Sequence, residues 1–257
     1  MLQARDIHAR LGGKPILHGI EFTAQAGQLT AIVGPNGSGK STLLKAITGE
    51  IDSTGPMHLN GHDIRRLKPW HLAGMRAVLP QAATLAFPFQ VIEVVRIGLR
   101  SGTSGQRDRL PELALAAVGL DGYAPRLYQE LSGGEQQRAQ LARVLCQVWE
   151  PLDNDQPRWL LLDEPVASLD IGHQLQVMTL LRDYARRGGG VVAVMHDLNL
   201  SAMFADRMTV MAKGRVTATG TPRAVMTDTT LSQTYNCPLR VNAAPEGQSF
   251  LLPHMAG

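Results

Sequence analysis

The sequence predicts an α/β protein with a mostly parallel sheet, N-terminal antiparallel β elements and an inserted α-helical subdomain. Residues 29–33 are a short apolar run, followed by a glycine-rich turn and then by helical spacing over residues 40–48. Two further apolar runs, at 159–162 and 191–195, are typical of buried strands, and a helix is expected between them at 171–186. Parallel strands joined by helices place a ligand at the carboxyl ends of the strands.

The order of these patterns divides the chain into a core and an insertion. Residues 19–26 alternate between apolar and polar side chains, as a half-buried strand does. Three segments in the middle of the chain have helical spacing: 93–99, 111–118 and 135–148. We therefore expect a core made of residues 1–84 and 149–257, interrupted by a helical subdomain at 85–148.

The C-terminal part of the core contains one further β pattern. Residues 208–220 predict a hairpin that turns at Lys213 and Gly214. The tail after about Val225 gives no functional signal, and its segment 232–241 is compatible with a strand that packs on the core.

The composition is that of an ordinary globular chain, with 44% hydrophobic and 18% charged residues. Lysine and arginine total 25 against 22 acidic residues, without a long basic run, so no nucleic-acid partner is expected. The two cysteines, Cys146 and Cys237, lack metal-type spacing and are expected to be free thiols. The sequence shows neither a signal peptide nor the ~18–20 consecutive apolar residues of a membrane span. We therefore expect a cytosolic chain, with any membrane pore supplied by another protein.

A phosphate-binding motif follows the first apolar strand. Residues 34–41 read GPNGSGKS, which fits the pattern G-x-x-x-x-G-K-[ST] of a P-loop NTPase. The glycines allow backbone N–H groups to surround phosphate oxygens, and the following helix presents its positive N-terminus. Lys40 is placed to reach the β- and γ-phosphates, while the Ser41 hydroxyl is a ligand for Mg²⁺. The predicted nucleotide-binding residues are Gly34, Pro35, Asn36, Gly37, Ser38, Gly39, Lys40, Ser41 and Thr42.

Two acids follow the second buried strand, in the sequence WLLLDE at residues 159–164. A strand that ends in two acids places Asp163 at its carboxyl tip, facing the phosphate loop. We expect Asp163 to hold Mg²⁺ through water and Glu164 to accept a proton from the attacking water.

A second anion-binding surface is predicted at residues 131–135, which read LSGGE and begin a helical segment. The residues concerned are Leu131, Ser132, Gly133, Gly134 and Glu135. Exposed glycine N–H groups, a hydroxyl and a helix N-terminus all favour an anion. The same letters also fit a capping box, and both interpretations can hold together. One nucleotide does not need two such surfaces unless one of them serves a nucleotide held by a second copy of the chain.

With these motifs the chain resembles the nucleotide-binding subunits of the ATP-binding cassette family. The resemblance covers about residues 2–225 and includes the LSGGE signature motif letter for letter. It implies a RecA-like core, a homodimer that encloses two ATP molecules, and hydrolysis with Mg²⁺. Each ATP would lie between Lys40 of one copy and the signature motif of the other.

The resemblance also implies roles for residues outside the two loops. Gln81 resembles the glutamine that contacts Mg²⁺ and the nucleophilic water, and His196 resembles the histidine that contacts the γ-phosphate. Three residues, Ser168, Leu169 and Asp170, match the loop that crosses the dimer interface. The implied catalytic residues are Lys40, Gln81, Glu164 and His196, and the implied Mg²⁺ ligands are Ser41, Gln81 and Asp163.

One position departs from the family pattern. The aromatic residue that stacks on adenine is expected near Leu11, where no aromatic residue stands. An aliphatic or arginine surface is the alternative, with Arg10 as the candidate, and this leaves the choice between ATP and GTP open.

The resemblance favours an importer ATPase on the cytoplasmic face of the bacterial inner membrane. Its implied partners are two integral-membrane permease subunits and, indirectly, a periplasmic binding protein. Residues 79–99 resemble the importers of iron-siderophores, haem and cobalamin, and the polar stretch 146–158 resembles the haem-import ATPases. A surface loop without meaning for the substrate is the alternative for 146–158. A soluble regulatory or nucleic-acid-linked cassette is the other class of function.

The permease is expected to contact the helical subdomain around residues 87–96. Phe87, Pro88 and Phe89 are candidates for this apolar contact. Packing inside the protein core explains these side chains equally well.

Overall fold

A six-stranded sheet forms the centre of the computed structural model, which describes residues 1–81, 87–101, 108–243, 247 and 249. The strand order is β13-β12-β3-β11-β10-β7. The strands are β3 (Leu29–Val33), β7 (Arg76–Leu79), β10 (Trp159–Asp163), β11 (Gly190–Val194), β12 (Arg207–Ala212) and β13 (Arg215–Gly220). All pairs are parallel except β12 with β13, which form the predicted hairpin around Lys213 and Gly214. The predicted α/β class is confirmed.

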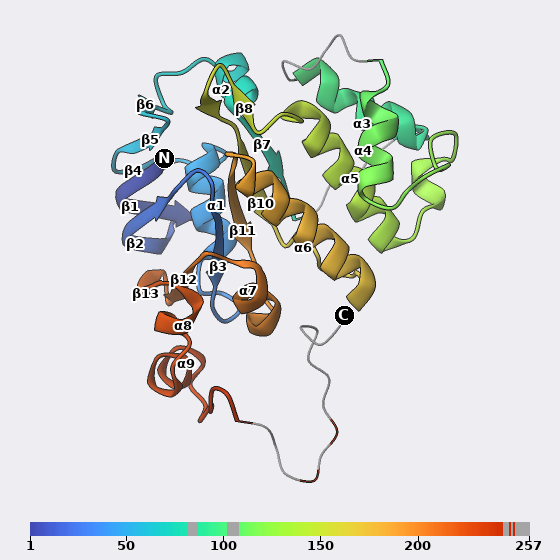
Figure 1. Ribbon diagram of the computed structural model, residues 1–257. Helices are drawn as coiled ribbons and strands as arrows, with labels where there is room; N and C mark the ends of the chain where they lie inside the picture. The colour runs from blue at the N-terminus through green and yellow to red at the C-terminus, as the bar shows by residue number, and fades with distance from the viewer. Residues whose placement is uncertain (82–86, 102–107, 244–246, 248, 250–257) are drawn as a thin grey trace.

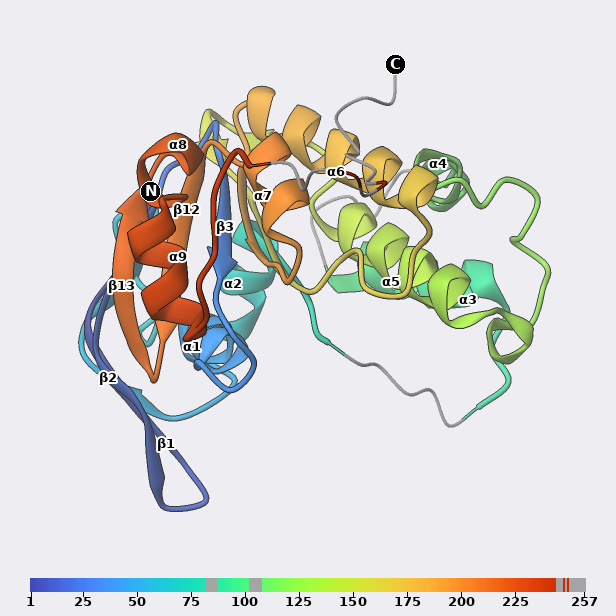
Figure 2. The same ribbon diagram turned by 90° about the horizontal axis from the view of Figure 1, so that it is seen from below.

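A second, antiparallel sheet covers one face of this centre. Its strands are β1 (Leu2–Leu11), β2 (Lys14–Ala24), β4 (Ser53–Thr54), β5 (Met57–Leu59) and β6 (His62–Asp63). Helix α1 (Lys40–Thr48) lies between the two sheets, because its buried Leu43 and Ile47 belong to one hydrophobic cluster with residues of both. Figure 1 shows β1 and β2 in blue and the short strands beside them in cyan, and Figure 2 shows the end of the β1–β2 hairpin projecting from the molecule.

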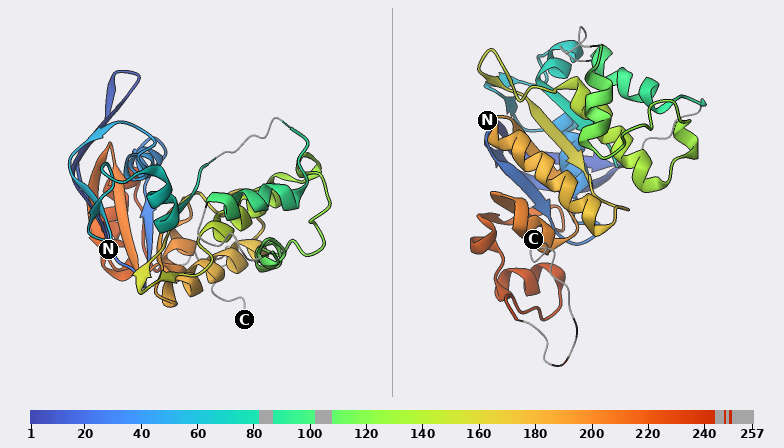
Figure 3. Two further views of the ribbon diagram at one scale, coloured as in Figure 1. Left: turned by 90° about the horizontal axis from the view of Figure 1, so that it is seen from above. Right: turned by 45° about the vertical axis from the view of Figure 1, so that its right-hand side comes forward.

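Helices cover the opposite face of the central sheet and extend beyond it. They are α3 (Val91–Ser101), α4 (Leu110–Ala117), α5 (Gly133–Gln147), α6 (Ile171–Arg186) and α7 (Leu198–Phe204), with a short 3-10 helix at Tyr128–Glu130. Helices α3, α4 and α5 form the green part of Figure 3, beside the sheet. Helices α3 and α5 pack closely, since a Cβ on Gly98 would lie 2.0 Å from the carbonyl oxygen of Arg143. The expected boundary between residues 84 and 85 and most of the polar stretch 101–108 lie outside the described residues.

The stretch at 146–158 is an ordered hairpin. Strands β8 (Leu152–Asp153) and β9 (Gln156–Pro157) are joined by Asn154 and Asp155, which both have positive φ, as a tight hairpin turn requires. The buried Arg158 guanidinium lies 2.8 Å from the Asp153 carboxylate. The Asn60 amide donates to the Pro157 carbonyl over 2.7 Å. The hairpin is therefore attached to the core.

The tail differs from the sequence prediction. A strand was compatible with residues 232–241, but residues up to Tyr235 complete a helix, α9 (Asp228–Tyr235), after the short α8 (Pro222–Val225). Thr227 caps α9 by accepting a hydrogen bond from the Thr230 N–H over 3.2 Å. Leu231 buries the apolar side of the helix.

Helix α2 (Pro69–Met75) lies in a part of the chain for which no helix was predicted from the sequence. Within the ranges that the structure covers, no helix has the length and apolar character needed to cross a membrane.

Candidate nucleotide site

A cavity of about 460 Å³ opens where β3, β10 and β11 end. It collects predicted site residues from four separate parts of the sequence, as expected at the carboxyl ends of parallel strands. Its lining residues are Asn36, Gly37, Ser38, Gly39, Lys40, Ser41, Thr42, Gln81, Glu164 and His196.

The phosphate loop folds around its own lysine. The Lys40 ammonium donates to the carbonyls of Gly34 and Pro35, over 2.8 and 3.1 Å. Burial lowers the pKa of Lys40, and the carboxylates of Glu164 and Asp163 act in the opposite direction. The loop thus keeps a buried cation directly under the cavity.

Glycine is required at the start of this loop. Gly34 has φ 148°, and a Cβ there would lie 2.1 Å from the Met211 carbonyl oxygen of β12. Further along the loop, the Ser38 hydroxyl is buried and has no hydrogen-bond partner among the residues described here. A buried, unsatisfied hydroxyl beside a loop of backbone donors fits a phosphate oxygen.

A hydroxyl and a carboxylate meet at the floor of the site. The Ser41 hydroxyl donates to an Asp163 oxygen over 3.0 Å, and Asp163 is only 2% exposed. Burial raises the pKa of Asp163, while the hydrogen bond from Ser41 opposes this shift. The Ser41 hydroxyl and the Asp163 carboxylate are hard oxygen ligands of the kind that Mg²⁺ prefers. Mg²⁺ usually retains several water ligands beside such groups.

Glu164 forms hydrogen bonds with residues from separate segments of the chain. Its Oε1 accepts a hydrogen bond from the Gln81 amide over 3.0 Å and lies 2.5 Å from His196 Nε2. The Glu164 N–H donates to the Val194 carbonyl over 3.1 Å, so β11 holds this peptide in place. The carboxylate can accept a proton while the amide and imidazole fix its direction.

One contact of Glu164 was missed by the sequence reasoning. The Gln137 amide on α5 donates to the Glu164 carbonyl oxygen over 2.5 Å. Because the acceptor is a backbone oxygen 27 positions later in the chain, no side-chain pattern in the sequence indicates this pair.

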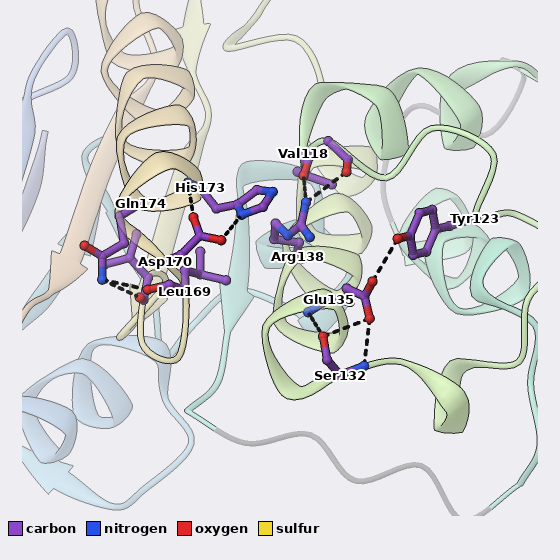
Figure 4. A network of polar contacts seen from close by, with 11 residues as sticks. Val118, Tyr123, Ser132, Glu135, Arg138, Leu169, Asp170, His173 and Gln174 are labelled. Atoms are coloured by element: carbon purple, nitrogen blue, oxygen red, sulfur yellow. Dashed lines mark hydrogen bonds and ion pairs between the residues drawn. The ribbon is translucent and has the colours of Figure 1, made fainter. Parts of the chain in front are cut away.

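The signature loop does not line the cavity, and Figure 4 shows its Ser132 and Glu135 at the start of α5. Ser132 caps α5, and the predicted capping box with Glu135 is present in full. Hydrogen bonds from the Ser132 N–H, the Ser132 hydroxyl and the Tyr123 hydroxyl lower the pKa of Glu135 to about 2. Ser132 and Gly133 are exposed, so this helix N-terminus faces solvent.

The loop expected at the dimer interface packs on the signature loop. A Cβ on Gly134 would lie 2.9 Å from the Ser168 carbonyl oxygen, and Leu169 contacts the same glycine. Asp170 caps α6, accepting hydrogen bonds from the His173 N–H at 2.9 Å and from its ring at 2.8 Å (Figure 4).

The candidates for adenine contact lie at the end of the β1–β2 hairpin. Leu11 is 42% exposed there. The Arg10 guanidinium donates to the Gly13 carbonyl over 2.7 and 3.1 Å, which fixes it at the turn.

The fold and the cavity together define a P-loop nucleoside triphosphatase, with a buried lysine, a serine–aspartate pair and a carboxylate in contact with a glutamine and a histidine. The model of the ABC transporter family matches residues 17–167. The chain belongs to this family.

Curated relatives match over almost the whole chain. The "Hemin import ATP-binding protein HmuV" of Jannaschia sp. (strain CCS1) is 62% identical over 257 residues, which are 100% of this chain and 95% of the relative. The protein of the same name from Roseobacter denitrificans (strain ATCC 33942 / OCh 114) is 59% identical, over 99% and 98% of the two chains.

Solved structures agree in fold. An ATP-binding subunit of an ABC transporter has a TM-score of 0.76 at 20% identity, covering 93% of this chain and 94% of that one. A nucleotide-free ATP-binding cassette from an ABC transporter has a TM-score of 0.74 at 23% identity, over 93% and 96%.

Proposed function

We propose that this chain is the ATP-hydrolysing subunit of a membrane importer, and that Glu164 is its general base. The convergence of the Gln81 amide and the His196 ring on one Glu164 oxygen is the observation that carries the proposal. This arrangement orients a carboxylate beside a phosphate loop, as hydrolysis of a γ-phosphate needs.

The phosphate loop binds the nucleotide by exchanging contacts. The Lys40 ammonium leaves the carbonyls of Gly34 and Pro35 for the β- and γ-phosphate oxygens, and the Ser38 hydroxyl gains the partner that it lacks. Ser41 and Asp163 would hold Mg²⁺, which neutralises charge on the phosphate oxygens when it is bound.

The attacking water is activated by Glu164. The carboxylate accepts one proton as the water oxygen bonds to the γ-phosphorus, and the bond between that phosphorus and ADP breaks. Gln81 orients the water from one side, and His196 contacts the γ-phosphate from the other. This set is completed by Lys40, whose positive charge stabilises the charge that develops on the phosphate.

The active form that we propose is a homodimer. The signature residues 131–135 lie outside the chain's own cavity and present an exposed helix N-terminus. A second copy would bring this surface to the γ-phosphate, with residues 168–170 at the interface. Residues 85–148 would form the subdomain that carries it, and residues 1–84 and 149–257 the RecA-like core.

Substitution of the base tests this mechanism. Glu164→Gln is expected to reduce kcat by about 10²–10⁴-fold, the range for a general base, and to trap a dimer in ATP and Mg²⁺. Single-turnover hydrolysis and size-exclusion chromatography measure the two effects. A variant that hydrolysed ATP at the normal rate and stayed monomeric would contradict the assignment.

Haem is the cargo that we propose, because two relatives that match the full chain are named hemin import ATP-binding proteins. The ordered hairpin β8–β9, in the stretch that resembles haem-import ATPases, also supports this choice. The chain would then lie on the cytoplasmic face of the inner membrane, held by two permease subunits that receive haem from a periplasmic binding protein. Ferric siderophores and cobalamin are the alternative cargoes.

A groove of about 850 Å³ is the permease contact that we propose. It lies beside α2 and combines apolar Ile64, Leu72 and Val78 with the cationic Arg65 and Arg143. Trp70 on the same helix is 63% exposed. Of the aromatics expected at a permease contact around residues 87–96, Phe87 is 68% exposed and Phe89 packs partly on the core, so Phe87 is the more accessible to a partner.

Co-purification and growth test the importer. The tagged chain is expected to bring down integral-membrane proteins, and Leu72→Glu is expected to abolish this without loss of ATP-dependent dimers. Deletion is expected to stop growth on haem as the limiting iron source, while growth on a ferric siderophore continues. The opposite growth pattern would replace haem by the siderophore, and a chain without membrane partners would contradict the importer.

A further inference from the structure

Two neighbouring glutamines follow the signature motif on α5, and they point to different parts of the molecule. The Gln136 amide donates to the carbonyls of Tyr128 and Leu131, over 3.3 and 3.0 Å, and so stays within its own helical region. The Gln137 amide instead leaves this region and donates to the Glu164 carbonyl oxygen over 2.5 Å.

The peptide that Gln137 contacts has an unusual conformation. Glu164 has φ 53°, in the left-handed region that residues with a side chain adopt only where their surroundings impose it. Three hydrogen bonds hold the backbone of this residue: its N–H donates to the Val194 carbonyl, and its carbonyl accepts from the Ala167 N–H at 3.2 Å and from the Gln137 side-chain amide. The bond to Val194 attaches the Glu164 backbone to β11, and the bond from Gln137 attaches it to α5.

The direction of the base depends on this conformation. A rotation of the Glu164 peptide would carry the carboxylate away from Gln81 and His196, which both contact its Oε1. A misplacement of about 1 Å at a reacting group is enough to cost a large part of the rate.

We propose that Gln137 is a positioning residue that holds the base Glu164 of its own chain in its working direction. The inference rests on the proposed function, in which Glu164 activates water and the signature motif serves the nucleotide of the second copy. Through Gln137, the helix that contacts the partner's nucleotide is tied to the base of this chain's own site, so each copy joins the two sites of the dimer.

The first test separates rate from binding. Gln137→Met removes the donor at similar volume and is expected to lower kcat about tenfold, with KM for ATP changed less than twofold. Gln136→Met is the matched control and is expected to keep kcat within about twofold. Equal losses in the two variants, or a Gln137→Met loss confined to KM, would overturn the proposal. Gln137→Leu takes the place of Gln137→Met if urea unfolding shows that the methionine variant is not folded.

The second test uses mixed dimers with one working base. One copy carries Glu164→Gln, so hydrolysis depends on the base of the other copy and on the signature motif of the Glu164→Gln copy. Gln137→Met is expected to lower the single-turnover rate about tenfold when it lies in the copy with the intact base, and by less than twofold in the other copy. The reverse pattern would show that the substitution acts through the signature motif and would overturn the proposal.

The Glu164→Gln homodimer separates this inference from the proposed function. If that variant neither forms a dimer in ATP nor loses hydrolysis, the proposed function fails and the role of Gln137 fails with it. If the Glu164→Gln variant forms a dimer in ATP and loses hydrolysis, the proposed function stands. If the mixed dimers then show the same single-turnover rate whichever copy carries Gln137→Met, only the role of Gln137 is rejected.

Discussion

The two loops that we propose to contact the nucleotide phosphates differ in the state of their polar groups. The phosphate loop encloses its own cation, since Lys40 is buried and bound to the carbonyls of Gly34 and Pro35. The signature loop is exposed, and its donors are bound to a carboxylate of the same helix, because Ser132 gives both its N–H and its hydroxyl to Glu135.

The difference indicates how the two loops are used. A loop with a buried ammonium and an unsatisfied buried hydroxyl is a site that one chain can fill with phosphate alone. A capped helix N-terminus on the surface has fewer free N–H donors, and we propose that it contacts a phosphate held by a second copy of the chain. Substitutions should therefore impair nucleotide binding in the first loop and dimer formation in the second.

Among substitutions that test the contrast between the two loops, Lys40→Met is expected to have the largest effect. Loss of the cation should lower kcat/KM about 10²–10³-fold, as removal of one key electrostatic donor does, and should weaken ATP binding by a single chain. Titration calorimetry of the chain with MgATP, below the concentration at which it dimerises, measures the binding. If Lys40→Met bound ATP normally and lost only dimer formation, the contrast between the loops would be wrong.

The glycines of the two loops give the next largest difference. Gly34→Ala should destabilise the chain by about 2–3 kcal/mol, because φ is 148° and the new Cβ would meet the Met211 carbonyl. Gly133→Ala meets nothing within 4 Å and lies in the first turn of α5, so it should stabilise the chain by about 0.5 kcal/mol. Urea unfolding without nucleotide measures both, and equal destabilisation would contradict the comparison.

The main parts of the site could be predicted because they depend on local chemistry. A strand, a glycine turn and a helix in sequence are enough to place residues 34–42, and two acids after an apolar run place Asp163 and Glu164. The predicted helix at 171–186 agrees residue for residue with α6. Gln81 and His196 were placed only through the resemblance, since a lone glutamine or histidine carries no pattern.

The remainder depends on contacts between distant segments. Gln137 could not be assigned because its acceptor is the backbone oxygen of Glu164. From the sequence, the Asn154–Asp155 turn was treated as part of a polar stretch, and no hairpin was predicted there. The hairpin is stabilised by the ion pair between Arg158 and Asp153 and by contacts with the core, which the local sequence does not indicate. Helix α9 was missed because a short helix held by a Thr227 cap has a weak periodicity of its own.

A smaller effect is expected from Ser132→Ala. Loss of the N-cap hydroxyl should cost about 1 kcal/mol of stability and, because the hydroxyl must leave Glu135 before it can donate to a phosphate of the second copy, should weaken the ATP-dependent dimer only several-fold. The dimer of the Glu164→Gln background, followed by analytical ultracentrifugation against ATP concentration, measures the second effect. ATP binding by the single chain should stay unchanged, and a parallel loss there would place Ser132 in the chain's own site.

The smallest effect concerns the charge on Glu135. Three hydrogen bonds hold its pKa at about 2, so the folded state favours the ionised form. The stability that this charge adds is present above the ordinary carboxyl pKa of about 4.3 and is lost as the pH falls toward 2. Glu135→Gln keeps a carbonyl acceptor but no charge, and because solvent screens this accessible carboxylate the variant should be less stable than the original chain by only about 0.5 kcal/mol at pH 7. Urea unfolding at pH 7, 5 and 3.5 should show this difference shrinking only at the lowest value. A difference that is the same at every pH would mean that the cap depends on shape and not on charge, and the two loops would then differ less than their contacts indicate.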